Sequence, residues 1–142
     1  IYGLAGLRIG YALAPAAVVT AIGKVRRAFD ITTPAQEAAL ASLDSPDELE
    51  RRRRANEEAR PQLEAILRDH GLDPVGPAVA NFLFAELGED SRPFFEALLR
   101  EGAIVRPTHG FGAPEAVRVT VGAPDEHRFL SDALDQVKAT LK

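Results

Sequence analysis

Residues 3–14 of the chain read GLAGLRIGYALA, a stretch in which Gly3, Gly6 and Gly10 surround the single arginine Arg8. Glycine permits a positive φ or a close approach of another group to the backbone. The arginine fork can donate two parallel hydrogen bonds to a phosphate and keeps its charge at any relevant pH. The stretch therefore indicates an anion site, although the same spacing also fits a glycine-containing turn with a surface arginine before a core strand.

The composition of the 142-residue chain is that of a globular protein. Apolar residues make up 46% and charged residues 27%, which allows a core to be buried. A net charge of −4 excludes a field that would gather nucleic acid or an acidic membrane surface. There is no cysteine, and His109 and His127 stand alone in the sequence, so no metal-ligand pattern is present. The longest apolar stretch, around residues 11–22, is too short to span a bilayer. A small secreted domain would usually need disulfides, so the lack of cysteine makes a cytoplasmic protein the expectation.

The first part of the chain predicts one strand followed by helices. Residues 7–14 are apolar and β-branched, which predicts a buried strand that stops at Pro15. A helix is expected from Pro15 to about Arg27. A second helix should follow, with Thr33 as its N-cap and Pro34 in its first turn.

A long helix is predicted to begin at residues 45–48, whose sequence SPDE is a capping box. The helix should run for roughly 36 Å to about His70, where Gly71 can end it. Pro61 is expected to kink or break the helix because proline removes a hydrogen bond. The arginine run at residues 51–54 is expected to form a solvated face paired with glutamates three or four positions away, rather than an RNA site.

From residue 79 the pattern predicts a small α+β unit. Two of its predicted strands, AIVRP and AVRVTV, are separated by the glycine-bearing loop THGFGAPE. The expected elements are a strand at 80–87, a helix at about 91–101 ended by Gly102, strands at 103–107 and 116–121, and an amphipathic helix from Pro124.

The stretch at residues 3–14 resembles the segment after the Schiff-base lysine of fold-type I pyridoxal-phosphate (PLP) aminotransferases. In the histidinol-phosphate branch of that family this segment commonly reads YGLAGLRIGY, and every position is present here. The resemblance places the lysine immediately before Ile1, so we expect no catalytic residue in this segment, which alone would be inactive. Further matching segments are ANF at 80–82, VRP at 105–107, GFG at 110–112, VRVTVG at 117–122 and the PDE run from Pro124.

The resemblance implies roles for four residues. Arg8 matches the arginine that binds the cofactor phosphate, and Arg118 matches the arginine that binds a substrate α-carboxylate. Arg106 matches an arginine that helps to hold the substrate phosphate in the histidinol-phosphate branch. Asn81 matches a position near the substrate, although asparagine before a strand is also a common turn residue. One guanidinium cluster can serve a phosphate and a carboxylate in turn, because its fork matches either anion.

The resemblance also implies the organisation of the molecule. The expected fold is α/β with an α+β small domain: a small antiparallel or mixed sheet with helices, plus one strand of the large domain. Residues 1–15 would end the large PLP-binding domain, residues 16–74 would be connecting helices including a long interdomain helix, and residues 75–142 would form the small domain.

The parent enzyme would transfer an amino group between histidinol phosphate and 2-oxoglutarate or glutamate, in histidine biosynthesis. It is expected to be a homodimer that uses PLP and binds neither nucleic acid nor membranes. Within the family, the alternatives are an aromatic amino-acid aminotransferase and a threonine-phosphate decarboxylase. The alternative that is not an enzyme is a free-standing interaction domain. The apolar strand predicted at residues 7–14 argues against it, because in such a domain that strand would be an exposed edge.

Overall fold

A computed structural model describes residues 1–140 of the chain. The chain divides into two compact units, the first formed by Ile1–Arg53 and the second beginning at Arg54. The domain boundaries expected after residues 15 and 74 stay predictions.

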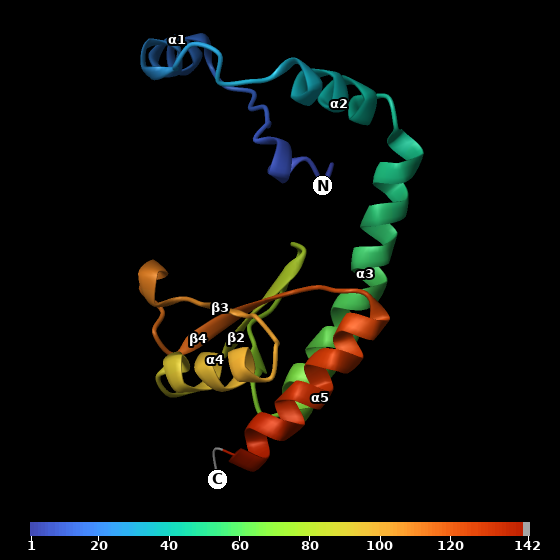
Figure 1. The fold of residues 1–142 in the computed structure, drawn as a ribbon, viewed down its shortest axis with the longest axis vertical. Coiled ribbons are helices and arrows are strands. Elements are labelled where there is room, and N and C mark those ends of the chain that lie inside the picture. Colours follow the sequence, from blue (N-terminus) through green and yellow to red (C-terminus); the bar gives the residue numbers. More distant parts are fainter. Residues whose placement is uncertain (141–142) are drawn as a thin grey trace. The chain divides into compact units, whose positions relative to one another are not determined.

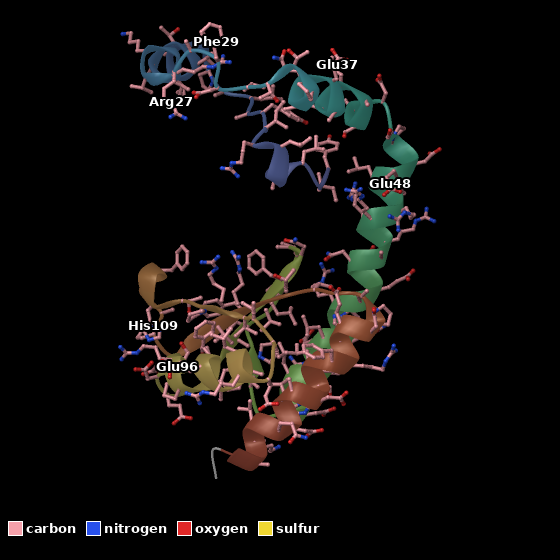
Figure 2. All side chains as sticks on the ribbon, viewed as in Figure 1. Arg27, Phe29, Glu37, Glu48, Glu96 and His109 are labelled. Atoms are coloured by element: carbon pink, nitrogen blue, oxygen red, sulfur yellow. The ribbon has the colours of Figure 1, made fainter. Side chains whose placement is uncertain are left out.

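The first unit is helical and has almost no core. It contains the 3-10 turn η1 (Ala5–Leu7), α1 (Ala16–Val25), α2 (Thr33–Leu43) and the start of α3 (Pro46–Asp69) (Figure 1). Helix α1 buries no residue, and Ala35 of α2 is the one buried residue of the unit. Phe29, which follows α1, is completely exposed (Figure 2).

The strand predicted at residues 7–14 is wrong. The structure has η1 at Ala5–Leu7 and irregular backbone from Arg8 to Pro15, and nearly all of these residues are exposed. A strand needs a neighbour for its backbone N–H and C=O groups. Residues 1–53 contain no other strand to supply one, so apolar composition alone does not produce an extended ladder here.

Two helix starts differ from the predictions by their capping contacts. The N-cap of α2 is Thr32, whose hydroxyl accepts the Ala35 N–H at 3.3 Å, so the predicted cap Thr33 lies inside the helix. Helix α3 begins at the predicted place, but the Ser45 hydroxyl donates to the Ala41 carbonyl at 2.9 Å instead of capping α3. The preceding helix thus competes for the hydroxyl that the capping box requires.

Helix α3 is unbroken from Pro46 to Asp69, with Pro61 inside it, so the predicted break is absent. Pro61 and Glu57, whose carbonyl loses its partner, are both exposed. Water can therefore bind the freed carbonyl. The predicted stop at Gly71 is confirmed: Gly71 has a φ of +83°, and the Leu72 N–H bonds to the Leu67 carbonyl at 3.0 Å.

The second unit is built on a four-stranded antiparallel sheet in the order β1-β2-β4-β3. The predicted small α+β unit is confirmed, with every pairing antiparallel. Strand β1 was not predicted, because two residues carry no periodicity. The strands are β1 (Asp73–Pro74), β2 (Phe82–Glu86), β3 (Arg106–Pro107) and β4 (Ala116–Thr120).

Helices cover one face of this sheet (Figure 1). They are α4 (Ser91–Arg100), α5 (Pro124–Thr140) and the part of α3 that belongs to the second unit. Leu63 and Leu67 of α3 and Leu98 of α4 are among its most deeply buried side chains. The core side chains are contributed by both helices and strands: Leu63, Leu67, Leu72, Leu83, Ala85, Ala97, Leu98, Ala103, Val105, Val117, Val119, Leu130, Ala133, Leu134 and Val137.

Both edge strands of the sheet contain a proline. In β1 the Val75 N–H bonds inward to the Phe84 carbonyl at 2.8 Å, and beside β3 the Thr108 N–H bonds inward to the Ala116 carbonyl at 3.3 Å. Because inward and outward backbone groups alternate along a strand, the nitrogens of the preceding residues face outward. Those residues are Pro74 and Pro107.

Within residues 1–140, no helix combines the length and the apolarity needed to cross a bilayer.

Candidate functional site

The uncovered face of the sheet in the second unit carries the residues that recognise anions best. Side chains alternate along β2 and β4, so that Leu83, Ala85, Val117 and Val119 point into the core. The residues between them lie on the opposite face. Figure 2 shows side chains that end in nitrogen atoms rising from the sheet on the side away from α4. The residues of this open face include Phe82, Phe84 and Glu86 of β2, Arg106 of β3, and Arg118 and Thr120 of β4.

Arg106 and Arg118 are directly opposed in the antiparallel register of β3 and β4. The neighbouring pair, Thr108 and Ala116, is joined by a hydrogen bond, so the alternation makes Arg106 and Arg118 a hydrogen-bonded pair as well. Such positions place two Cα atoms about 5.5 Å apart with their side chains on the same face. The sheet therefore brings together the two arginines that the sequence singles out.

Two phenylalanines flank Arg118 on the side of β2. Phe84 is directly opposed to Arg118 in the register, and Phe82 is opposed to Thr120. The Arg118 Cζ lies over the Phe82 ring, 5.0 Å from its centroid. Arg118 Nε is buried and has no hydrogen-bond partner among residues 1–140. The ring thus holds the guanidinium in place while leaving its donors uncommitted.

The electrostatics of this face favour a bound anion. Like charges directly opposite one another destabilise a pair of strands. Arg106 and Arg118 are directly opposed, and no ion pair of either with a carboxylate is recorded among the described residues, although Glu86 lies on the same face. A phosphate or carboxylate between the two forks would neutralise both charges and receive their hydrogen bonds. The phenylalanines were missed at the sequence level, although the alternation of FLF at residues 82–84 is the signal that places them here.

Asn81 lies just before β2 and is exposed. Its backbone carbonyl accepts the Val121 N–H at 2.9 Å, while the preceding carbonyl, of Ala80, accepts from Asn56 Nδ2 of α3 at 3.2 Å. These two bonds fix the entry to β2. The structure records no contact of the Asn81 side chain with Arg106 or Arg118, so its substrate role stays a prediction.

Arg8 belongs to the first unit, where it follows η1 directly. Its φ of 56° is in the left-handed region, and its N–H bonds back to the Ala5 carbonyl at 3.1 Å. Arg8 Nη1 also donates to that carbonyl at 3.1 Å. The guanidinium is exposed and has further donors available. A tight turn thus presents an exposed cation for whose remaining N–H groups the structure records no partner among the described residues.

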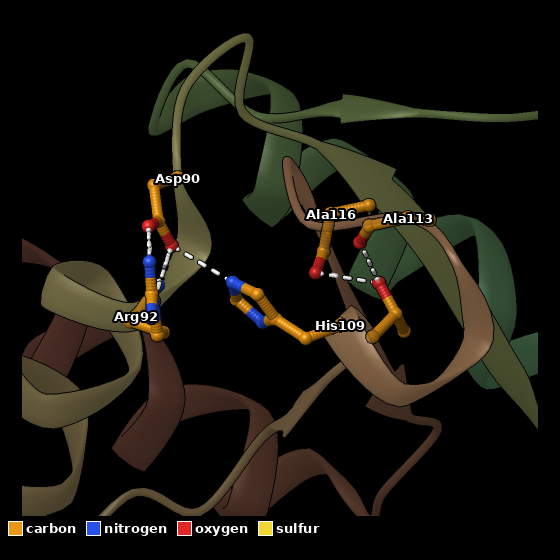
Figure 3. A network of polar contacts seen from close by, with 6 residues as sticks. Asp90, Arg92, His109, Ala113 and Ala116 are labelled. Atoms are coloured by element: carbon orange, nitrogen blue, oxygen red, sulfur yellow. Dashed lines mark hydrogen bonds and ion pairs between the residues drawn. The ribbon is translucent and has the colours of Figure 1, made fainter.

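A polar network holds the turn that follows Arg106 and Pro107 (Figure 3). Asp90 accepts from Arg92 and, at 2.9 Å through Oδ1, contacts Nε2 of His109. The Arg92 guanidinium and backbone N–H, together with His109, hold the pKa of Asp90 far below its usual range. Thr108 is buried, with its hydroxyl 2.7 Å from the carbonyl oxygens of both Ala113 and Ala116.

His127 has a backbone partner in the loop before α5. It is buried at the start of α5, and its Nε2 accepts the Gly122 N–H at 3.1 Å. This bond assigns the proton to Nδ1, which is buried and has no partner among the described residues. Burial lowers the pKa of His127, so the neutral imidazole is the folded form.

The arginine run at residues 51–54 is paired with a glutamate, as predicted for its first two members. Glu48 accepts from Arg51 Nε at 2.7 Å and from Arg52 Nε at 2.8 Å. The hydrogen bonds from Arg51 and then Arg52 lower the pKa of Glu48 to about 2. The carboxylate that the capping box would use is therefore held by the next turn of α3.

These features agree with what the chain resembles. The family of class I and II aminotransferases matches residues 1–134. The chain belongs to this family of aminotransferases.

The similar proteins point to one branch of the family. The histidinol-phosphate aminotransferase 2 of Pseudomonas fluorescens is 43% identical over 138 residues, which are 97% of this chain and 37% of that protein. The enzyme of the same description from Methylococcus capsulatus is 42% identical over 136 residues, covering 96% and 36%. The chain thus spans a little over a third of the length of these curated relatives.

Solved structures give the same family. Histidinol-phosphate aminotransferase from Sinorhizobium meliloti, solved in complex with pyridoxal-5'-phosphate, matches with a TM-score of 0.85 and 28% identity over 99% of this chain and 39% of that one. Aspartate aminotransferase from Thermotoga maritima matches with a TM-score of 0.73 and 28% identity, covering 96% and 36%. The fold is therefore that of part of a fold-type I aminotransferase, which confirms the predicted class. The extra large-domain strand expected at residues 7–14 is not present.

Proposed function

We propose that the protein containing this chain is a PLP-dependent aminotransferase that moves an amino group between histidinol phosphate and 2-oxoglutarate or glutamate. The observation that carries the proposal is the opposed pair Arg106 and Arg118 on the open face of the sheet. This pair belongs to a chain of the aminotransferase family whose relatives include histidinol-phosphate aminotransferases. An interaction domain without catalysis would not need two opposed cations.

The residues of the first unit fit the phosphate of PLP. Arg8 keeps free N–H donors on an exposed guanidinium, and a Cβ added at Gly6 or Gly10 beside it would meet no atom within 4 Å. The turn is therefore open enough for a group as large as a phosphate, and its donor is an anion binder. When bound, PLP supplies the electron sink of the reaction, and the chain supplies binding and orientation. Arg8 would hold the cofactor by its phosphate.

The second unit would bind the substrates. Histidinol phosphate carries a phosphate and no α-carboxylate, whereas 2-oxoglutarate carries two carboxylates. The forks of Arg106 and Arg118 match either anion, so one pair of residues can bind both substrates in turn. Phe82 holds the Arg118 guanidinium from below and excludes water from that side. Asn81, at the start of β2, would contribute a further polar contact.

The proposal includes a cytoplasmic homodimer. Helix α1 leaves Val18, Val19, Ile22 and Val25 exposed, and a second subunit or the remainder of the protein would cover them. Apolar patches of this kind on one helix are typical of surfaces that are covered by other protein.

The test is substrate profiling of the full-length protein that contains this chain, loaded with PLP. We expect amino transfer from histidinol phosphate to 2-oxoglutarate, with weaker transfer from phenylalanine and no release of carbon dioxide from threonine phosphate. Arg118→Ala should lose most of this activity. Arg100 is an exposed arginine on α4, so Arg100→Ala removes the same charge elsewhere and serves as the control. Preference for phenylalanine, or decarboxylation of threonine phosphate, would contradict the proposed substrate while keeping the family.

A further inference from the structure

A chain of hydrogen bonds within the first unit connects α3 to the N-terminal segment. Glu48 Oε1 accepts from Arg52 Nε at 2.8 Å, and Arg52 Nη1 donates to the Ile1 carbonyl at 3.1 Å. Arg51 binds the same carboxylate at 2.7 Å, but its side chain is 67% exposed against 39% for Arg52. Two neighbouring arginines thus share one glutamate, and the structure records only Arg52 in contact with the segment.

Gly3 is shaped to receive Arg52. Its φ is +71°, which disfavours any residue with a side chain. A Cβ at this position would also lie 2.9 Å from Arg52 Nη1, so the end of the Arg52 side chain would have to move out of its present place. The Ile1 carbonyl and the bare Cα of Gly3 are therefore two independent features that match the Arg52 guanidinium.

The N-terminal segment has little else to hold it. None of residues 1–8 is buried. Ile1 and Tyr2 border a pocket of about 180 Å³, whose other walls include Ser42 of α2 and Leu49 of α3. Because side chains do not fill this space, the segment is not fixed by apolar packing. A hydrogen bond from a charged donor, itself fixed by Glu48, then has a large share in ordering it.

We propose that Arg52 is a positioning residue: it holds residues 1–3 through the Ile1 carbonyl and Gly3, and thereby fixes the turn that presents Arg8 to the phosphate of PLP. The inference rests on the proposed function of Arg8. Arg52 itself does not touch the cofactor; it acts through the short chain of residues between Gly3 and Arg8, of which Ala5–Leu7 form η1.

The test compares two ligands on the full-length apoprotein, PLP and pyridoxal, which lacks the phosphate. We expect Arg52→Ala to weaken PLP binding roughly tenfold, the scale of one hydrogen bond to a charged group, and to leave pyridoxal binding unchanged. Arg8→Ala should lose more of the preference for PLP, and Arg8→Ala with Arg52→Ala should lose no more than Arg8→Ala alone. Arg51→Ala is the matched control and should bind both ligands as the wild type does.

A merely structural role for Arg52 predicts a different pattern, with both ligands weakened equally and the unfolding temperature lowered. If Arg52→Ala changes the affinities for PLP and pyridoxal by the same factor, or changes neither, the proposal is overturned. Arg52→Lys keeps the charge but has one ammonium group in place of the fork, so it should retain the fold and still lose preference for PLP. Gly3→Ala, which alters the segment that Arg52 contacts, should also reduce the preference for PLP over pyridoxal.

One outcome separates this inference from the proposed function. If the wild type itself shows no preference for PLP over pyridoxal, the proposed role of Arg8 fails. Hydrogen exchange of the peptide covering residues 1–8 then tests whether Arg52 holds the N-terminal segment. Faster exchange in Arg52→Ala than in Arg51→Ala supports that contact, and equal exchange contradicts it.

Discussion

The ring of Phe82 lies under the Arg118 guanidinium, with 5.0 Å between Arg118 Cζ and the ring centroid. The contact joins neighbouring strands, because Phe82 is on β2 and Arg118 on β4. It keeps a cation in place on the open face of the sheet without using any of the hydrogen-bond donors that an anion needs.

Phe82→Leu should therefore weaken binding of the anionic substrate. The substitution keeps an apolar side chain but removes the π face, at a cost of about 1 kcal/mol, or roughly fivefold in KM. Phe129→Leu, on the exposed side of α5, is the control. Steady-state kinetics on histidinol phosphate would measure the effect, and equal KM values for the two variants would show that the ring contact is irrelevant to binding.

Arg106→Ala should have opposite effects on stability and on binding. Removing one of two opposed cations relieves a repulsion of about 0.2–1 kcal/mol, so the ligand-free protein should unfold at a higher denaturant concentration. The same variant should lose the stabilisation that the wild type gains from added phosphate. Urea unfolding at low ionic strength, with and without phosphate, measures both, and Arg100→Ala should change neither. Lower stability of ligand-free Arg106→Ala would refute the repulsion.

Thr108→Val should destabilise the second unit by about 1–3 kcal/mol. Valine has nearly the shape of threonine, but it removes the hydroxyl that now lies 2.7 Å from the buried carbonyl of Ala116 and the half-buried carbonyl of Ala113. Thr108→Ser retains the hydroxyl and should cost much less. The measurement is urea unfolding followed by circular dichroism, in which equal losses for the two variants would assign the effect to the methyl group.

The stability of the protein should fall as the pH is lowered through the ordinary histidine pKa of 6.5, because of His127. Burial lowers the pKa of His127 in the folded state, so the unfolded chain binds a proton before the folded one does. The stability that the protein gains from keeping His127 neutral is complete above pH 6.5. It is lost as the pH falls toward the pKa of His127 in the folded state. His127→Gln, whose amide oxygen can accept the Gly122 N–H, should flatten the profile measured by urea unfolding at a series of pH values. An unchanged profile would assign the acid sensitivity to other groups.

Glu48 should titrate far below an ordinary glutamate. Its pKa is lowered from 4.5 to about 2 by Arg51 and Arg52, so the pairing stabilises α3 above 4.5 and is lost as the pH falls toward 2. Carboxyl NMR of the protein should place the midpoint accordingly, and Arg51→Ala should raise it. A midpoint near 4.5 in the wild type would mean that the ion pairs do not persist in solution.

Sequence patterns predicted the second unit well because its elements are defined locally. Gly71 and Gly102 each end a helix with a positive φ, as glycine does by its own conformational freedom. The alternation in β2 and β4 reports directly which residues are buried. The pairing of Arg106 with Arg118 was not derivable from the residues alone, because register depends on how the turn at 108–113 closes, through Thr108 and the Asp90 contact to His109.

In the first unit the three helices were predicted, but the strand at residues 7–14 and the capping contacts were wrong for a physical reason. An apolar stretch such as residues 7–14 forms a strand only when a neighbouring strand is present, and that information is not in the stretch itself. Likewise, Ser45 is a good N-cap in isolation but lies within reach of the Ala41 carbonyl at the end of α2. The role of Arg8 came from the resemblance, since an exposed arginine on a turn has no local signature of its ligand.

The outward-facing prolines of the two edge strands have a consequence for the behaviour of the protein at high concentration. A further strand can add to a sheet only by accepting from and donating to its edge, and Pro74 and Pro107 each lack the N–H that such an addition would use. Edge-to-edge pairing with a further strand is therefore disfavoured at both borders of this sheet. The open face, where the arginines are, remains for recognition.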